Sequence, residues 1–142
     1  MKSTLKPGIV FEHTYTVPEN KTVPALYPDA PEFQEMPEVF ATGFMVGFLE
    51  WACIKAIEAH LDWPQEMTVG THVDVSHEAA TPPGMTVTAT VKLTHVDGKR
   101  LTFDVEAHDG VDTISRGRHE RAIINRDAFS ARIKNKIETA QS

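Results

Sequence analysis

The chain has 142 residues, 41% of them apolar and 24% charged, and its 20 acidic and 14 basic residues give a formal net charge of −6 at pH 7. This length and composition suit one globular domain over residues 1–142, and the acidic balance argues against a nucleic-acid partner, since such domains usually carry a basic face. No apolar run approaches the ~20 residues of a membrane span, MKSTLKPGIVFEH contains no apolar signal segment, and the single Cys53 excludes an intramolecular disulfide, so we expect a cytoplasmic protein without a membrane partner.

The first part of the chain predicts a strand followed by a long loop. Residues 8–17, GIVFEHTYTV, combine β-branched and aromatic residues with partial alternation, which is typical of a strand. Residues 18–38 contain five prolines, and because proline removes a donor and fixes φ, neither a long helix nor a central strand is expected there. A loop of this length is often a lid over a binding site, although a stiff arm without a chemical role is equally compatible with the pattern.

Residues 41–60 predict a helix that is apolar on almost every side, with Glu50 in its middle. At ~100° per residue, Gly43, Gly47 and Glu50 lie on one face of this helix. Burying an unpaired carboxylate costs several kcal/mol, so Glu50 needs a partner or a use. The face therefore indicates either a narrow slot that leads to a reactive carboxylate, or tight packing with Glu50 paired to an arginine at a dimer interface.

The remainder of the chain predicts strands and a short helix. The apolar pattern changes to period two, which indicates strands over residues 68–80, 84–96, 99–108 and 112–125. Turn residues separate these strands, namely Pro82-Pro83-Gly84, Asp97-Gly98 and Asp109-Gly110. Residues 127–138 predict an amphipathic C-terminal helix with Asp127 as its N-cap.

This order of elements predicts an α+β domain of the hotdog type. A strand, a long loop and an apolar helix are followed by what reads as a four-strand antiparallel meander. A helix that is apolar nearly all round must be covered on most sides, and one curved antiparallel sheet of about five strands wrapped around one central helix does so.

Two further polar residues are candidates for chemistry. Thr42 stands where the helix could begin, and free backbone N–H groups at a helix start bind a carbonyl oxygen or an anion; a simple N-cap is the alternative. His77 comes late in the first strand after the helix, and a strand that crosses the helix would bring it to the face of Glu50, although a lone histidine is more often structural. A metal site of His72, His77 and Glu78 is not expected, because residues five apart on a strand face opposite sides.

Four segments together resemble the fluoroacetyl-CoA thioesterase family of hotdog proteins, over nearly the whole chain. They are MPEVFATGFMVGFLEWAC, SHEAATPPGMTVTATV, AHDGVD and GRHERAII. The resemblance implies that a homodimer hydrolyses a short acyl-CoA thioester without a metal or organic cofactor. It also implies catalytic roles for Thr42, Glu50 and His77, in which Glu50 attacks the carbonyl or activates water, Thr42 positions Glu50 and His77 handles a proton.

The resemblance extends to residues that would bind the substrate. It implies that the backbone of Gly70 helps to place the thioester and that Arg121 is a partner for the buried carboxylate. In the lid, Phe33 matches a family phenylalanine, whereas the second family phenylalanine is Met36 in this chain. Two other functions stay open on the residues alone: an enoyl-thioester hydratase of the same fold, and a non-catalytic module that binds an acyl group or small molecule.

Overall fold

The computed structural model describes all 142 residues. Its strands are β1 (Val10–Thr16), β2 (Glu66–Val75), β3 (Thr86–Asp97), β4 (Arg100–His108) and β5 (Thr113–Asn125). Its α-helices are α1 (Val23–Leu26), α2 (Pro31–Gln34), α3 (Thr42–Ile57) and α4 (Arg126–Gln141), with short 3-10 helices at Glu19–Lys21 and Glu58–His60. No helix of the chain is both long enough and apolar enough to cross a membrane.

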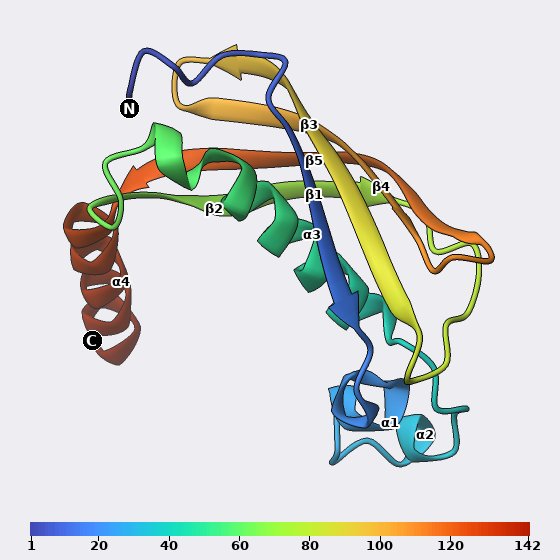
Figure 1. Cartoon of the computed structure of the whole chain (residues 1–142). Helices are drawn as coiled ribbons and strands as arrows, with labels where there is room; N and C mark the ends of the chain where they lie inside the picture. The colour runs from blue at the N-terminus through green and yellow to red at the C-terminus, as the bar shows by residue number, and fades with distance from the viewer.

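The five strands form one antiparallel sheet in the order β1-β3-β4-β5-β2, and this sheet curves around α3 (Figure 1). The predicted hotdog fold is therefore confirmed. The predicted four-strand meander is wrong, because only β3, β4 and β5 follow one another across the sheet. The segment that contains Pro82 and Pro83 is not a hairpin turn; it carries the chain from β2 at one edge to β3 on the other side of the sheet.

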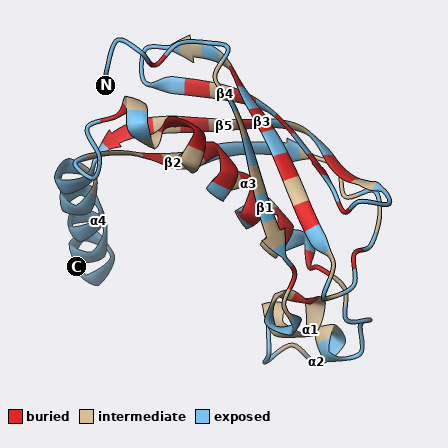
Figure 2. Ribbon diagram, viewed as in Figure 1, coloured by how far each residue is buried: buried red, intermediate tan, exposed pale blue.

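The core lies between the concave face of the sheet and one side of α3 (Figure 2). Along β3 and β4, buried apolar residues alternate with more exposed ones, as expected for strands with one face in the core. They pack on the buried residues of α3, which are Met45, Phe48, Leu49, Ala52, Cys53, Ala56 and Ile57. The other side of α3 is open, because Gly43 and Gly47 are exposed and Trp51 is 44% exposed. A helix expected to be covered on most sides therefore leaves one apolar face free.

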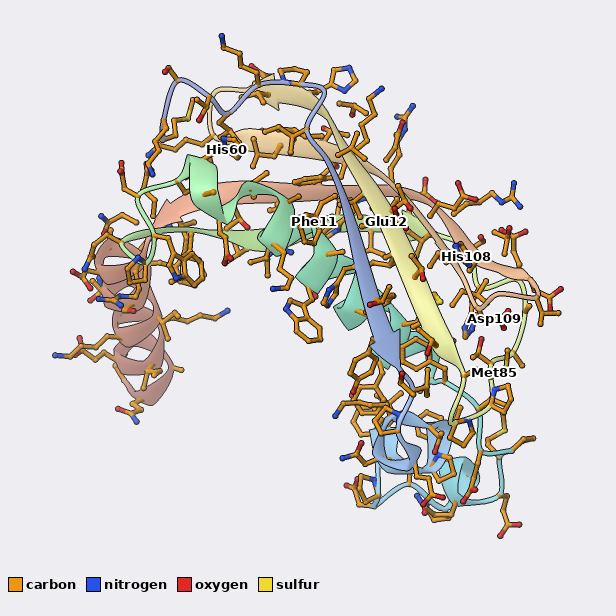
Figure 3. The ribbon with its side chains drawn as sticks, viewed as in Figure 1. Phe11, Glu12, His60, Met85, His108 and Asp109 are labelled. Atoms are coloured by element: carbon orange, nitrogen blue, oxygen red, sulfur yellow. The ribbon has the colours of Figure 1, made fainter.

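The segment after β2 is fixed in place although it belongs to no strand. β2 ends at Val75, so His77 lies beyond this strand, although the predicted strand over residues 68–80 included it. The backbone N–H of Glu78 donates to the carbonyl of Ile114 (2.7 Å), and Thr81 Oγ1 donates to Asp109 Oδ2 (2.9 Å) in the turn before β5 (Figure 3). Burial raises the pKa of Asp109, but hydrogen bonds from the backbone of the turn and from Thr81 outweigh that effect and lower it, so this anchor is a carboxylate. These contacts hold His77 against the sheet.

The proline-rich segment 18–38 contains only short helices, as predicted. Gln34 Nε2 donates to the carbonyls of Pro24 (2.9 Å) and Tyr27 (3.2 Å), which ties α2 to α1. Leu26 covers the first turn of α3 so closely that a Cβ at Gly43 would lie 3.1 Å from Leu26 Cδ1. The segment therefore packs on the N-terminal end of α3.

The C-terminal helix α4 projects from the body of the domain and contains no buried residue (Figure 1). Its N-cap is Asn125, whose side-chain Oδ1 accepts from the N–H of Ala128 (3.0 Å), rather than the predicted Asp127. The helix begins at Arg126 because β5 runs directly into it, which leaves Asp127 in the first turn.

We expect the substitution Asn125→Ala to weaken α4 against local opening by about 1 kcal/mol, because one backbone donor loses its acceptor. Native-state hydrogen exchange of the α4 amides measures this change. Asp127→Asn is the control: it removes a charge that the helix dipole favours but leaves the cap, so its effect should be smaller. Equal losses in the two variants would contradict the assignment of the cap.

Candidate active site

Glu50 lies at the centre of α3 and forms an ion pair with Arg121 of β5. Arg121 Nη1 donates to Glu50 Oε1 (3.0 Å), and the side chain of Arg121 is only 4% exposed. The guanidinium is held by β2, because Arg121 Nε donates to Thr68 Oγ1 (2.8 Å) and Nη2 donates to the Thr68 carbonyl (2.9 Å). The carboxylate is thus paired but still accessible: its side chain is 35% exposed, and Oε2 accepts no hydrogen bond within the chain.

His119 is a further member of this cluster that the sequence argument missed. It is 2% exposed, and its Nδ1 lies 2.8 Å from the backbone carbonyl of His72. Because a carbonyl only accepts, Nδ1 carries the proton, and Nε2 is the acceptor for Arg121 Nη1 (3.0 Å). Burial lowers the pKa of His119, with the charge of Arg121 acting in the same direction, so the ring is neutral. The strand period was the available signal, because residues 119 and 121 of β5 face the same side.

Gly70 is required by the position of the carboxylate. It lies on β2 opposite Arg121, directly before a β-bulge. A Cβ built at Gly70 would collide with Glu50 Oε1 and would lie 3.3 Å from His119 Cε1. Only a residue without a side chain therefore lets Glu50 approach β2.

Thr42 and His77 form a second cluster at the N-terminal end of α3. Thr42 is the first residue of the helix, its N-cap is Ala41, and Thr42 Oγ1 is hydrogen-bonded to His77 Nδ1 (2.7 Å). Thr42 is therefore not a capping residue. The other ring nitrogen, His77 Nε2, is buried without a partner. Burial lowers the pKa of His77, and the nearby backbone of Ala79 acts in the opposite direction.

The start of α3 also presents unpaired backbone donors. The first intrahelical hydrogen bond is donated by the N–H of Met45 to the carbonyl of Ala41 (2.8 Å). The N–H groups of Thr42, Gly43 and Phe44 precede it and have no acceptor within the chain. Such a helix start favours negative charge, so this end of α3 suits an anion or a polarised carbonyl oxygen.

The two clusters are separated within one chain. Thr42 and Glu50 are eight residues apart on α3, which corresponds to about 12 Å along the helix axis. From the sequence we expected His77 to lie at the face of Glu50. The structure does not bring it there within one chain. His77 lies past the end of β2, at the N-terminal end of α3, whereas the contact between Glu50 and Gly70 is at the middle of this helix.

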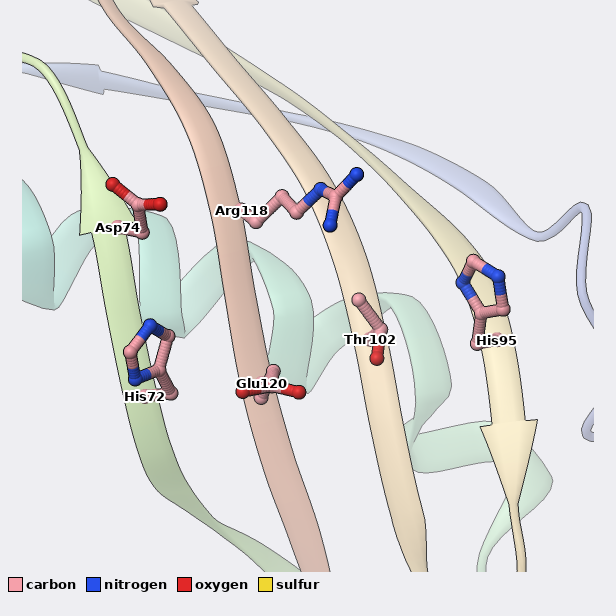
Figure 4. Close-up of a pocket in the computed structure, with 6 residues that line it drawn as sticks. All are labelled: His72, Asp74, His95, Thr102, Arg118 and Glu120. Atoms are coloured by element: carbon pink, nitrogen blue, oxygen red, sulfur yellow. The ribbon is translucent and has the colours of Figure 1, made fainter.

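Two surface hollows lie near these clusters. An apolar groove of about 260 Å³ runs between β1 and the open face of α3, and its lining is Tyr15, Lys21, Phe40, Gly43, Phe44, Gly47, Phe48 and Trp51. Neither lid candidate lines it: Phe33 packs on Tyr27 (ring centroids 5.7 Å apart), and Met36 is exposed. A polar hollow of about 320 Å³ lies on the outer face of the sheet (Figure 4), and its lining is His72, Asp74, His95, Thr102, Arg118 and Glu120.

A curved antiparallel sheet wrapped around one helix is the hotdog fold, which solved thioesterase structures share. A crystal structure of a thioesterase superfamily member from Thermus thermophilus is 26% identical, with a TM-score of 0.84 over 98% of each chain. Closer similarity defines the family. Residues 17–127 match the model of the fluoroacetyl-CoA-specific thioesterases.

Individual relatives agree with this match. The fluoroacetyl-CoA thioesterase of Streptantibioticus cattleyicolor is 53% identical over 136 residues, which are 96% of this chain and 97% of that protein. A solved structure of a fluoroacetyl-CoA thioesterase is 52% identical, with a TM-score of 0.91 over 94% of this chain and 98% of the other. The chain belongs to the fluoroacetyl-CoA-specific thioesterase family, and the resemblance and thioesterase activity predicted from its motifs are confirmed.

We expect the free energy of unfolding to fall as the pH is lowered from about 7 to 5. Burial lowers the pKa of His13, His77 and His119 in the folded protein, so the unfolded chain binds protons more readily. The stability that depends on these neutral histidines is fully present above the pKa of histidine in the unfolded chain, which is near 6.5. It is lost as the pH falls below that value toward the lower pKa of the folded protein. Denaturant unfolding at several pH values measures the fall.

Two variants assign part of this fall to one residue. His119→Gln replaces the buried histidine by a residue without an ionisable side chain, so its free energy of unfolding should fall less than that of the wild type. His95→Gln, on the exposed outer face, is the control and should show the same fall as the wild type. A fall of the same size in His119→Gln and in the wild type would contradict the assignment.

Proposed function

We propose that this protein hydrolyses short-chain acyl-CoA thioesters, with fluoroacetyl-CoA among its substrates, to the free acid and CoA. The observation that carries the proposal is the state of Glu50: Oε1 is held by Arg121 while Oε2 is free and accessible. A carboxylate in this state can act on a substrate without losing the partner that makes its burial possible. The proposal agrees with the activity named for the 53% identical relative.

Thioester hydrolysis needs a nucleophile, a proton for the leaving thiolate and donors for the oxyanion. In our proposal Glu50 Oε2 either takes a proton from a water that attacks the carbonyl carbon, or attacks this carbon itself to form a mixed anhydride that water then hydrolyses. In both cases the C–S bond to CoA breaks. His77, paired with Thr42, handles the proton that the sulfur of CoA receives. The free N–H groups at the start of α3 bind the oxygen of the thioester, because a helix N-terminus stabilises developing negative charge.

This division of roles requires both clusters at one substrate, and we infer that a homodimer supplies them. β2 is an edge strand whose residues 70–74 are all exposed, so its unpaired backbone groups are a template for another strand. Beside it, α3 has its open apolar face. A second copy that pairs antiparallel with β2 would extend the sheet and cover this face, with the self-complementary contacts of a two-fold interface.

A two-fold axis would also bring together the two clusters that are separate within one chain. Along β2, Gly70 comes first and lies against Glu50, and the segment that follows the strand brings His77 to Thr42. A two-fold near Val73 reverses this order, so Glu50 of one protomer faces the Thr42–His77 pair of its partner. Each dimer then has two sites, and each site takes its carboxylate from one chain and its helix start from the other.

The lid residues Phe33 and Met36, and the backbone of Gly70, complete the proposal as substrate-binding groups. α1 packs on the N-terminal end of α3 through Leu26, and α2, which carries Phe33, is tied to α1 by Gln34; in our proposal these two helices cover the acyl group next to the oxyanion site. No metal or organic cofactor is part of the proposal, because Glu50 supplies the nucleophile or base and His77 the proton transfer. A cytoplasmic location is proposed on the single thiol, Cys53, which is buried and unpaired.

We expect Glu50→Gln to lower turnover at least a thousandfold, because the amide cannot attack the thioester or accept a proton. Release of free CoA from acetyl-, fluoroacetyl-, propionyl- and butyryl-CoA measures turnover and ranks the acyl groups. Glu58→Gln, at the C-cap of the same helix, is the matched control and should retain full activity. A folded Glu50→Gln variant with near wild-type turnover would overturn the assignment.

We expect two inactive variants, Glu50→Gln and His77→Ala, to restore activity when they are unfolded together and refolded as a mixture. Random pairing makes half of the dimers mixed, and each mixed dimer has one intact site of two, so about one quarter of the wild-type activity should return. The separately refolded variants are the controls. No recovery, with mixed dimers present, would show that each site lies within one chain.

A further inference from the structure

We propose that His119 is a positioning residue for hydrolysis: it fixes Arg121 so that the guanidinium holds Glu50 Oε1 and leaves Oε2 free to react. The proposal rests on the function proposed above, since it assigns a role within the same site. His119 Nε2 is 3.8 Å from Glu50 Oε1, beyond hydrogen-bond distance, whereas both groups accept from Arg121 Nη1, so we assign the positioning effect of His119 to Arg121.

The hydrogen bonds of Arg121 show what His119 contributes. Two of its contacts go to Thr68, and both N–H groups of Nη1 are needed for the other two, Glu50 Oε1 and His119 Nε2, each at 3.0 Å. The guanidinium plane is thus fixed from β2, β5 and α3 together. If His119 did not accept, one Nη1–H would be buried without a partner, and the side chain could rotate toward the second oxygen of Glu50.

A neutral acceptor is the appropriate one at this position. A carboxylate at residue 119 would pair with Arg121 itself and would repel Glu50 at close range. A neutral imidazole accepts one hydrogen bond and adds no charge, so the positive charge of Arg121 stays available to Glu50. The proton on Nδ1 is fixed by the carbonyl of His72, which sets both the tautomer and the orientation of the ring.

His119 also connects Glu50 to the edge of the sheet. The carbonyl that it binds belongs to His72, on the far side of the bulge that follows Gly70. The His72 side chain lies on the outer face, where it lines the polar hollow (Figure 4). Its carbonyl points the other way and binds His119. The backbone of the exposed edge strand thus helps to define where the carboxylate lies.

The test compares His119→Leu with His119→Gln. Leucine has a similar volume but its side chain neither donates nor accepts, whereas the glutamine amide offers an NH2 group as donor and a carbonyl oxygen as acceptor. We expect His119→Leu to lower kcat by between about 10-fold and 100-fold with KM changed less than about threefold, because the reacting carboxylate is misplaced. His119→Gln should recover most of this loss, and His95→Gln should retain wild-type rates.

A double variant separates positioning from a merely structural role. In a Glu50→Gln background the residue that His119 positions is already removed, so adding His119→Leu should lower the residual rate no further. If His119 had only a structural role, His119→Leu would lower the rate by the same factor in both backgrounds, and His119→Gln and His119→Leu would lose the same activity. Either result would overturn the proposal. Wild-type kcat in His119→Leu would overturn it as well.

The wild-type protein distinguishes this proposal from the one on which it rests. Absence of CoA release from every thioester by the wild-type dimer would refute the proposed function. Normal release by the wild type together with an unaffected His119→Leu variant would refute the positioning role alone.

Discussion

The ion pair between Glu50 and Arg121 is the interaction on which the rest of the site depends. A carboxylate inside an apolar helix is stable only with a partner, and a buried arginine has the same requirement. Arg121 meets it through Thr68 and His119, and His119 in turn binds the carbonyl of His72. The hydrogen bonds of this charged cluster therefore reach backbone carbonyls of β2, namely those of Thr68 and His72. Glu50 itself lies so close to this strand that Gly70 must have no side chain.

The central helix has two chemical functions, and the chain keeps them apart. Its N-terminus presents free N–H groups, whereas its middle presents a carboxylate. A carboxylate next to the helix start would itself be bound there as an anion and would no longer be free to react. Two turns of helix between Thr42 and Glu50 prevent this, so the donors remain available for a substrate oxygen.

Patterns along the sequence predicted the elements that depend on local chemistry. The apolar helix, the strands β3, β4 and β5 and the proline-rich segment lie close to where periodicity and turn residues placed them, whereas β2 ends five residues before its predicted end at residue 80. Strand order was not predicted correctly, because the neighbour of β2 is chosen by packing over the whole sheet rather than by the turn that follows it. The predicted position of His77 was wrong for the same reason. The segment around His77 is held by contacts to β5 and to the turn at Asp109, which are distant in sequence.

The exposed edge of β2 has a consequence for how activity relates to protein concentration. In the proposed dimer, pairing of this edge creates the interface and also completes both sites. Assembly and catalysis then form one equilibrium governed by mass action, and a dilute chain that folds correctly would still be inert. The same edge, once paired with its own copy, is no longer open to other strands, so the contact that activates the enzyme also protects it from aggregation.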